Sequence, residues 1–126
     1  MTADEIYMYL CQQCSPEEIK ATIRAPVSHW RATKLHKKGG ALPVEITASG
    51  HTRIITQEHI KQIIQDFSAN RLTALEVEYL MSCLELCGDF VCENTLQQAV
   101  FDLSSPEVNG ELTPARIQEI RTSYLS

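Results

Sequence analysis

The five cysteines are the residues of this chain with the widest chemical range. Cys11 and Cys14 form a CxxC pair, and Cys83, Cys87 and Cys92 follow at spacings of four and five. Two thiolates one turn apart bind a zinc ion or form a disulfide, so a zinc-stabilised adaptor and a redox protein are alternatives. The later spacings do not form the usual zinc knuckle, and Cys83 and Cys87 fall on an apolar helical face. We therefore interpret the cysteines as reduced packing residues and expect no metal site.

The four histidines show no catalytic or metal-binding spacing. His29, His36, His51 and His59 include no i, i+4 helical pair, and none stands beside a serine or cysteine in a nucleophile motif. The glycine pair at residues 39–40 lacks the lysine and hydroxyl of a phosphate-binding loop. The sequence therefore predicts a protein that is not an enzyme, with no catalytic residues, cofactor or small-molecule substrate.

One short basic segment, residues 30–38, supports a different hypothesis. It carries Trp30 together with four cations, which are Arg31, Lys34, Lys37 and Lys38. The cations would contact phosphates and Trp30 would stack on a base, so a small nucleic-acid-binding regulatory protein is the alternative function. The overall acidity and the absence of a named nucleic-acid-binding module favour instead a solvated strand edge guarded by lysines.

Capping patterns mark where the helices that carry these residues begin. A hydroxyl residue is followed three positions later by glutamate in Thr2 to Glu5, Ser15 to Glu18 and Thr73 to Glu76, and Thr113 precedes Pro114. Two short helices are expected to open the chain, the second ending at Pro26. Apolar residues at helical spacing predict a further helix that ends near Asn70: Ile60, Ile63, Ile64 and Phe67.

The helix that begins after Thr73 is predicted to be the most buried. It is apolar almost all round, with a narrow polar edge at Glu78, Ser82 and Glu85. We expect Gly88 to end this helix in the left-handed conformation. A helix begun by Asn94 and a last helix after Thr113 are expected to follow.

Residues 29–56 show no helical stripe and include turn residues, which predicts strands. Alternating residues at 42–47 and 52–55, with a glycine turn at 39–40, indicate an antiparallel hairpin or three-stranded ribbon. The expected fold is mainly α (α+β), a single domain over residues 1–126. It is a helical bundle of about five to six helices with a small antiparallel β-ribbon near residues 30–56.

Charge is distributed unevenly along the chain. Residues 1–72 have nine Lys/Arg and seven Asp/Glu, whereas residues 73–126 have two and nine, a net charge of −7. The acidic half indicates a basic partner and disfavours nucleic acid or an anionic membrane. No long apolar run is present, and the first ten residues carry two acids where a secretory signal would be basic, so we expect a cytoplasmic protein without membrane contact.

Three segments of the C-terminal half carry a family resemblance. They are Leu72 to Leu80 (LTALEVEYL), Gly88 to Phe90 (GDF) and Ser105 to Thr113 (SPEVNGELT). Together they resemble the immunity proteins of bacterial polymorphic toxin systems, including contact-dependent growth inhibition. In those proteins a leucine-rich helix with an E-x-x-Y segment precedes an acidic loop and a connection of the form PEiNGpLT. Glu111 stands where that pattern has proline.

The resemblance implies a cytoplasmic antitoxin, a non-enzymatic inhibitor that binds a cognate toxin domain. The expected toxin is a basic nuclease, blocked by stoichiometric protein-protein interaction. The acidic residues expected to face it are Glu76, Glu78, Glu85, Asp89 and Glu93. Phe90 is the candidate apolar anchor, because charge sets the association rate more than the affinity. The β-ribbon, which would add a strand to the partner, is the alternative surface.

Overall fold

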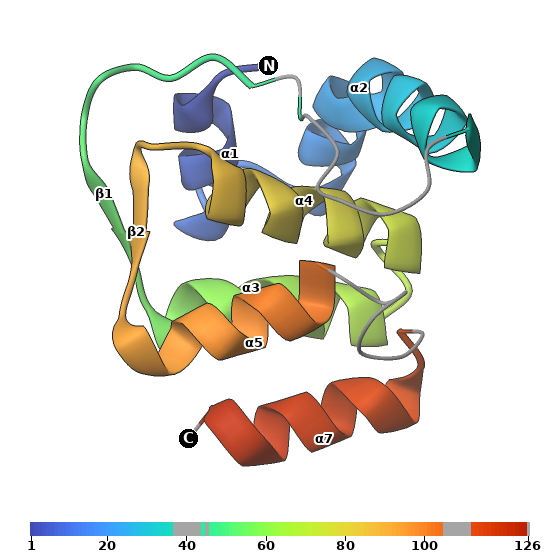
Figure 1. The fold of residues 1–126 in the computed structure, drawn as a ribbon, viewed down its shortest axis with the longest axis vertical. Coiled ribbons are helices and arrows are strands. Elements are labelled where there is room, and N and C mark those ends of the chain that lie inside the picture. The colour runs from blue at the N-terminus through green and yellow to red at the C-terminus, as the bar shows by residue number, and fades with distance from the viewer. Residues whose placement is uncertain (37–43, 45, 105–111, 126) are drawn as a thin grey trace.

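The fold is described from a computed structural model, whose described residues are 1–36, 44, 46–104 and 112–125. They form six helices and two short strands in the order α1 (Ala3–Leu10), α2 (Pro16–His36), β1 (Arg53–Ile55), α3 (Gln57–Ser68), α4 (Ala74–Leu86), β2 (Phe90–Cys92), α5 (Asn94–Ser104) and α7 (Pro114–Tyr124). Figure 1 shows α4 lying between α1 and α2 on one side and α3 and α5 on the other. Helix α7 packs against α5 at the far end of the molecule (Figure 1).

The capping patterns correctly predict where these helices begin. Thr2 and Glu5 form a reciprocal capping box at α1, and Thr73 and Glu76 form one at α4. The hydroxyl of Thr113 accepts a hydrogen bond from the backbone N–H of Arg116 at α7. Each cap satisfies N–H groups that have no partner inside the helix, which is why these starts can be predicted from local sequence alone.

Helix α2 is longer than expected, so the prediction that it stops at Pro26 was wrong. Pro26 lies inside the helix, which continues to His36. An interior proline costs about 3 kcal/mol because it removes a backbone hydrogen bond and crowds the preceding turn. The helix offsets this cost by burying apolar side chains along one face, namely Ile19, Ile23, Val27 and Trp30.

Helix α4 is the buried centre of the fold, as expected. Consecutive residues from Val77 to Leu84 are all buried, and α4 packs against α5, α2 and α3. The predicted polar edge was wrong at two of its three residues, because Glu78 and Ser82 are buried and only Glu85 is exposed. Ser82 remains satisfied there because its hydroxyl donates to the Glu78 carbonyl at 2.9 Å.

The two strands pair in parallel, so the predicted antiparallel ribbon near residues 30–56 was wrong. Strand β1 pairs with β2, placing Ile54 opposite Val91. Helices α3 and α4 separate the strands in the chain, and a connection of this kind allows parallel pairing. Of the other expected strand segments, residues 29–36 belong to α2, Thr47 makes an isolated bridge to Thr2, and residues 39–43 and 45 lie outside the described residues.

The end of α4 also differs from the prediction. Its C-cap is Cys87 with extended φ and ψ of −82° and 125°, and Gly88 is not among the residues with positive φ. The chain therefore leaves α4 in an extended conformation at Cys87 and reaches β2 through a turn at Gly88 and Asp89, in which the N–H of Phe90 donates to the Cys87 carbonyl at 3.2 Å. By contrast, Asn70, two residues after the end of α3, does adopt the left-handed conformation, with a φ of 62°. Asparagine tolerates this conformation better than most residues and often follows a helix end. No helix in the described part of the chain is long and apolar enough to cross a membrane.

Candidate functional site

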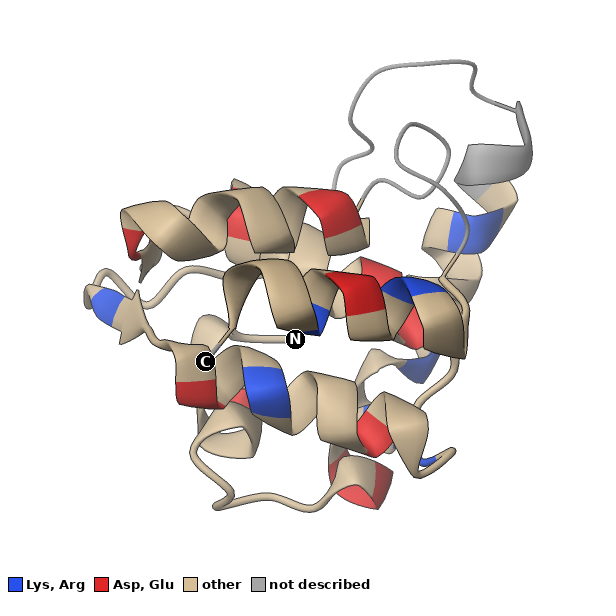
Figure 2. Cartoon of the chain, turned by 90° about the horizontal axis from the view of Figure 1, so that it is seen from below, with Lys and Arg blue, Asp and Glu red and all other residues tan. Residues whose placement is uncertain are grey.

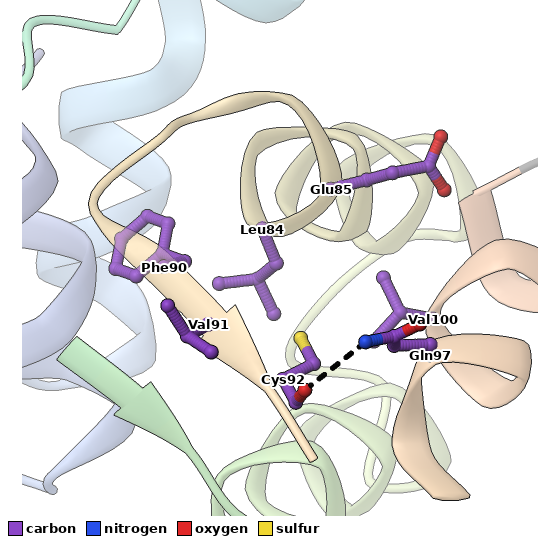
Figure 3. Close-up of a pocket in the computed structure, with 7 residues that line it drawn as sticks. All are labelled: Leu84, Glu85, Phe90, Val91, Cys92, Gln97 and Val100. Carbon is purple, nitrogen blue, oxygen red and sulfur yellow. Dashed lines mark hydrogen bonds between the residues drawn. The ribbon is translucent and has the colours of Figure 1, made fainter. Parts of the chain in front are cut away.

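A groove of about 430 Å³ lies where β2 passes the C-terminal end of α4 and the first turns of α5. Its lining residues are Leu84, Glu85, Phe90, Val91, Cys92, Gln97 and Val100. Figure 3 shows Leu84 and Cys92 directed into the space between these elements, with the Glu85 carboxylate at the rim and turned away from Leu84. The side-chain amide of Gln97 reaches across and donates to the backbone carbonyl of Cys92 at 3.4 Å (Figure 3).

Asp89 fixes the strand that forms one wall of this groove. Its carboxylate accepts hydrogen bonds from the backbone N–H and hydroxyl of Ser49, at 2.6 and 3.0 Å, and from the N–H of Gly50 at 3.3 Å. The backbone N–H of Ser49 is the main cause of a lowered pKa for Asp89, so the carboxylate stays ionised. The backbone carbonyl of Asp89 accepts a hydrogen bond from the backbone N–H of Arg53 at 2.7 Å, which anchors β2 to β1.

The groove has an apolar side that is open to solvent. Val91 is 49% exposed, and its register partner Ile54 is 59% exposed, so the two short strands present adjacent apolar side chains. Leu86 at the end of α4 and Phe101 on α5 are further exposed apolar residues. Adjacent exposed apolar side chains, as at Ile54 and Val91, are typical of an interaction surface, whereas single ones such as Leu86 and Phe101 are common on any protein.

The segment that forms the groove carries negative charge alone. From Ala74 to Ser104 there are six Asp/Glu and no Lys, Arg or His. In Figure 2, α7 carries both basic residues (blue) and an acidic residue (red). Helix α5, in contrast, contains no basic residue. Burial, and to a lesser extent the nearby charge of Glu85, raise the pKa of the Cys92 thiol, so this sulfur stays protonated in the groove.

The six residues expected to bind a partner have different positions in the structure. Glu85 and Glu93 are exposed, at the rim of the groove and directly after β2. Phe90 lines the groove but is buried, and Asp89 is the buried clamp described above. Glu76 caps α4 and pairs with Lys20 at 3.6 Å, and Glu78 is 5% exposed within α4.

Val91 is the groove residue that the sequence did not single out. The alternation of a strand would have identified it, because neighbours of a buried Phe90 point to the opposite face. The sequence predicts the end of a helix at Gly88 and the start of another at Asn94, with no strand between them. Residues 90–92 form a strand because they pair with β1. A segment of only three residues is too short for its sequence to predict that pairing.

The other candidate residues occupy mostly structural positions. Cys83 and Cys87 are buried in α4 and at its end, and burial raises the pKa of Cys83 to about 12. The described residues contain no group of three or more His, Cys, Asp or Glu that could hold a metal ion. Trp30 is buried with its ring edge-to-face against Tyr79, at a centroid distance of 5.5 Å, so it does not offer a stacking face to a nucleic acid. Lys37 and Lys38 lie outside the described residues.

No family model, curated protein or solved structure matches this chain. The resemblance over residues 72–113 therefore stays a prediction, and residues 105–111 of that match lie outside the described residues. The groove between β2, α4 and α5 is accordingly the structural basis for a functional proposal.

Proposed function

We propose that this protein is a stoichiometric inhibitor of the immunity-protein type, which binds a basic toxin domain through the groove at β2, α4 and α5. The observation that carries the proposal is an open apolar groove within a segment that has six acids and no cation. Protein-protein sites combine apolar anchors at the centre with a polar rim in this way.

The two exposed glutamates define the charge that a partner must match. Glu85 lies at the rim, where its Oε2 accepts a hydrogen bond from the Ser104 hydroxyl at 3.1 Å, and Glu93 follows β2. A nuclease domain presents Lys and Arg to the phosphates of its substrate. Such a surface is complementary to the groove, and long-range attraction would speed their association.

The apolar part of the groove would supply affinity and limit the choice of partner. Val91, which lines the groove, and its register partner Ile54 are exposed on paired strands whose backbones hydrogen-bond to each other, so little backbone entropy is lost when they are covered. A partner that offers only positive charge would leave these side chains in water. A partner must therefore match both the negative charge and the apolar surface of the groove. This double requirement favours one cognate protein over basic proteins that bind polyanions in general.

The experiment that tests the proposal is a calorimetric titration against the C-terminal domain of the protein encoded directly upstream, here called the upstream-encoded domain. We expect a 1:1 complex and complete loss of the domain's toxicity only when the inhibitor is at least equimolar. Val91→Lys should weaken binding by about 1–3 kcal/mol, because it places a charge at the apolar centre of the contact. Met8→Lys on α1 changes a similarly exposed apolar residue, at 45%, and should bind as the unmodified protein does.

Loss of toxicity when the inhibitor is far less abundant than the toxin domain would contradict the proposal, because each inhibitor molecule would then have to inactivate many toxin molecules. Absence of any complex would contradict it as well. Equal weakening by Val91→Lys and Met8→Lys would remove the groove as the binding surface.

A further inference from the structure

Strand β2 has two edges, and only one of them pairs with β1. The backbone N–H of Arg53 donates to the Asp89 carbonyl, and the register places Arg53 beside Phe90. In a parallel ladder of this register, the N–H and the carbonyl of Val91 both bond to β1. Successive residues of a strand direct these groups to opposite edges, so those of Phe90 and Cys92 point away from β1.

The edge that points away from β1 opens into the groove. Figure 3 shows β1, in green, on one side of β2, and Leu84, Gln97 and Val100 on the other side. The side-chain amide of Gln97 agrees with this direction, because it reaches the Cys92 carbonyl from the groove side at 3.4 Å. One wall of the groove is therefore a strand edge, in addition to the apolar side chains that line it.

Two backbone groups of this edge are available to a partner. The N–H of Phe90 is already used, because it donates to the Cys87 carbonyl at 3.2 Å. The carbonyl of Cys92 is used by Gln97. Within the described part of the chain, no hydrogen bond uses the carbonyl of Phe90 or the N–H of Cys92. These two groups are two residues apart on one edge, which is the spacing at which an added strand forms its hydrogen bonds.

We propose that the partner adds one extended segment as a third strand along the groove edge of β2, an inference that rests on the proposed function. A segment of the upstream-encoded domain would donate an N–H to the Phe90 carbonyl and accept the N–H of Cys92. Addition of a strand to an open sheet edge is a recurrent mode of protein recognition. Strand β2 lies outside residues 30–56, so this edge differs from the ribbon edge expected from the sequence.

The surroundings of the edge define which side chains such a segment carries. Side chains of an added strand alternate between the two faces of the sheet. Those on the inner face would enter the groove against Leu84 and Val100, and those on the outer face would lie beside the exposed Val91, so the centre of the segment is apolar. Glu85 at the rim and Glu93 directly after β2 are exposed, which favours Lys or Arg at the ends of the segment.

Residue-resolved amide hydrogen exchange, measured by nuclear magnetic resonance on the 1:1 complex with the upstream-encoded domain, tests the added strand. In the free protein the amide of Val91, which bonds to β1, should exchange slowly, whereas the amide of Cys92 should exchange fast. Binding should slow exchange at Cys92 by about a hundredfold or more and change exchange at Val91 far less. Nuclear Overhauser contacts between α-protons and amide protons of the two chains should appear at Phe90 and Cys92.

A pair of variants tests the same hydrogen bond through the affinity. Cys92→Pro removes the N–H, and proline is tolerated on a strand edge that does not pair within the protein. Cys92→Val changes the same side chain and keeps the N–H. Cys92→Pro should bind the upstream-encoded domain about tenfold more weakly than Cys92→Val does in calorimetric titration, while both keep the same far-ultraviolet circular dichroism.

The outcomes separate this inference from the proposed function. A complex in which the Cys92 amide exchanges as fast as in the free protein would overturn the added strand and leave the proposed function in place. Equal affinities of folded Cys92→Pro and Cys92→Val would do the same. Failure of the upstream-encoded domain to bind at all would remove both. The exchange measurement needs no variant, so it decides even if Cys92→Pro fails to fold.

Discussion

Replacing both Glu85 and Glu93 with lysine is expected to slow association with the upstream-encoded domain by about tenfold or more at low ionic strength. These are the exposed acids of the groove segment at its rim and directly after β2, so their reversal turns attraction into repulsion at the contact. Stopped-flow association rates at low and high salt measure the effect. The loss should shrink as salt is added, because screening removes the attraction from the unmodified protein.

A matched variant separates the effect of charge in the groove from the effect of the protein's net charge. Glu58→Lys with Glu119→Lys changes the net charge by the same amount at exposed residues of α3 and α7, outside the groove. This control should slow association much less. If both double variants were slowed equally, net charge would account for the rate and the groove would have no special role.

Asp66→Ala is expected to lower the free energy of unfolding by about 3 kcal/mol, because it leaves buried polar groups without a partner. Asp66 is fully buried in α3 and accepts a hydrogen bond from the hydroxyl of Tyr9, on α1. It also accepts from the Gln62 amide at 3.1 Å and pairs with Arg71 at 3.5 Å. The carboxylate thus joins α1 to α3, and urea unfolding followed by circular dichroism measures its contribution.

Two milder variants rank the contacts of Asp66. Arg71→Ala should cost less than about 1 kcal/mol, because the Arg71 side chain is half exposed. Tyr9→Phe should cost about 1–2 kcal/mol, since the carboxylate keeps Gln62 and Arg71. An Asp66→Ala variant no less stable than Arg71→Ala would show that the buried pair with Tyr9 does not hold α1 in place.

Helix starts could be predicted from the sequence, because a cap and its partner are three residues apart. Thr2, Thr73 and Thr113 each begin a helix one residue later for this reason. The burial of α4 could also be predicted, because few of its residues are polar. These features depend on local chemistry and on composition within one element.

Features that depend on distant partners could not be predicted in the same way. The strand pattern at Arg53–Ile55 indicates a strand, but its partner Phe90–Cys92 follows two helices later in the chain. Pro26 is a helix breaker by local rules, and only the burial of the surrounding apolar face shows why α2 continues. Local propensity is outweighed wherever tertiary packing stabilises the alternative more.

In the candidate site, too, features that depend on local sequence could be predicted and features that depend on distant partners could not. Glu85 and Glu93 were correctly expected to be exposed, because glutamate at a helix end or in a loop is usually solvated. Asp89 was expected to face a partner, but backbone donors at Ser49 and Gly50 compensate for its burial, and their approach is a tertiary feature. An acidic sequence therefore predicts the sign of the surface potential more reliably than it predicts which acids a partner contacts.

Hydrogen-deuterium exchange of the protein alone and in complex with the upstream-encoded domain shows whether the partner docks in the groove. We expect binding to slow exchange across residues 84–100, which include all the residues that line the groove of β2, α4 and α5. Exchange in α2 should not change. Protection confined to α2 or α1, with residues 84–100 unaffected in a saturated complex, would contradict the proposed docking site.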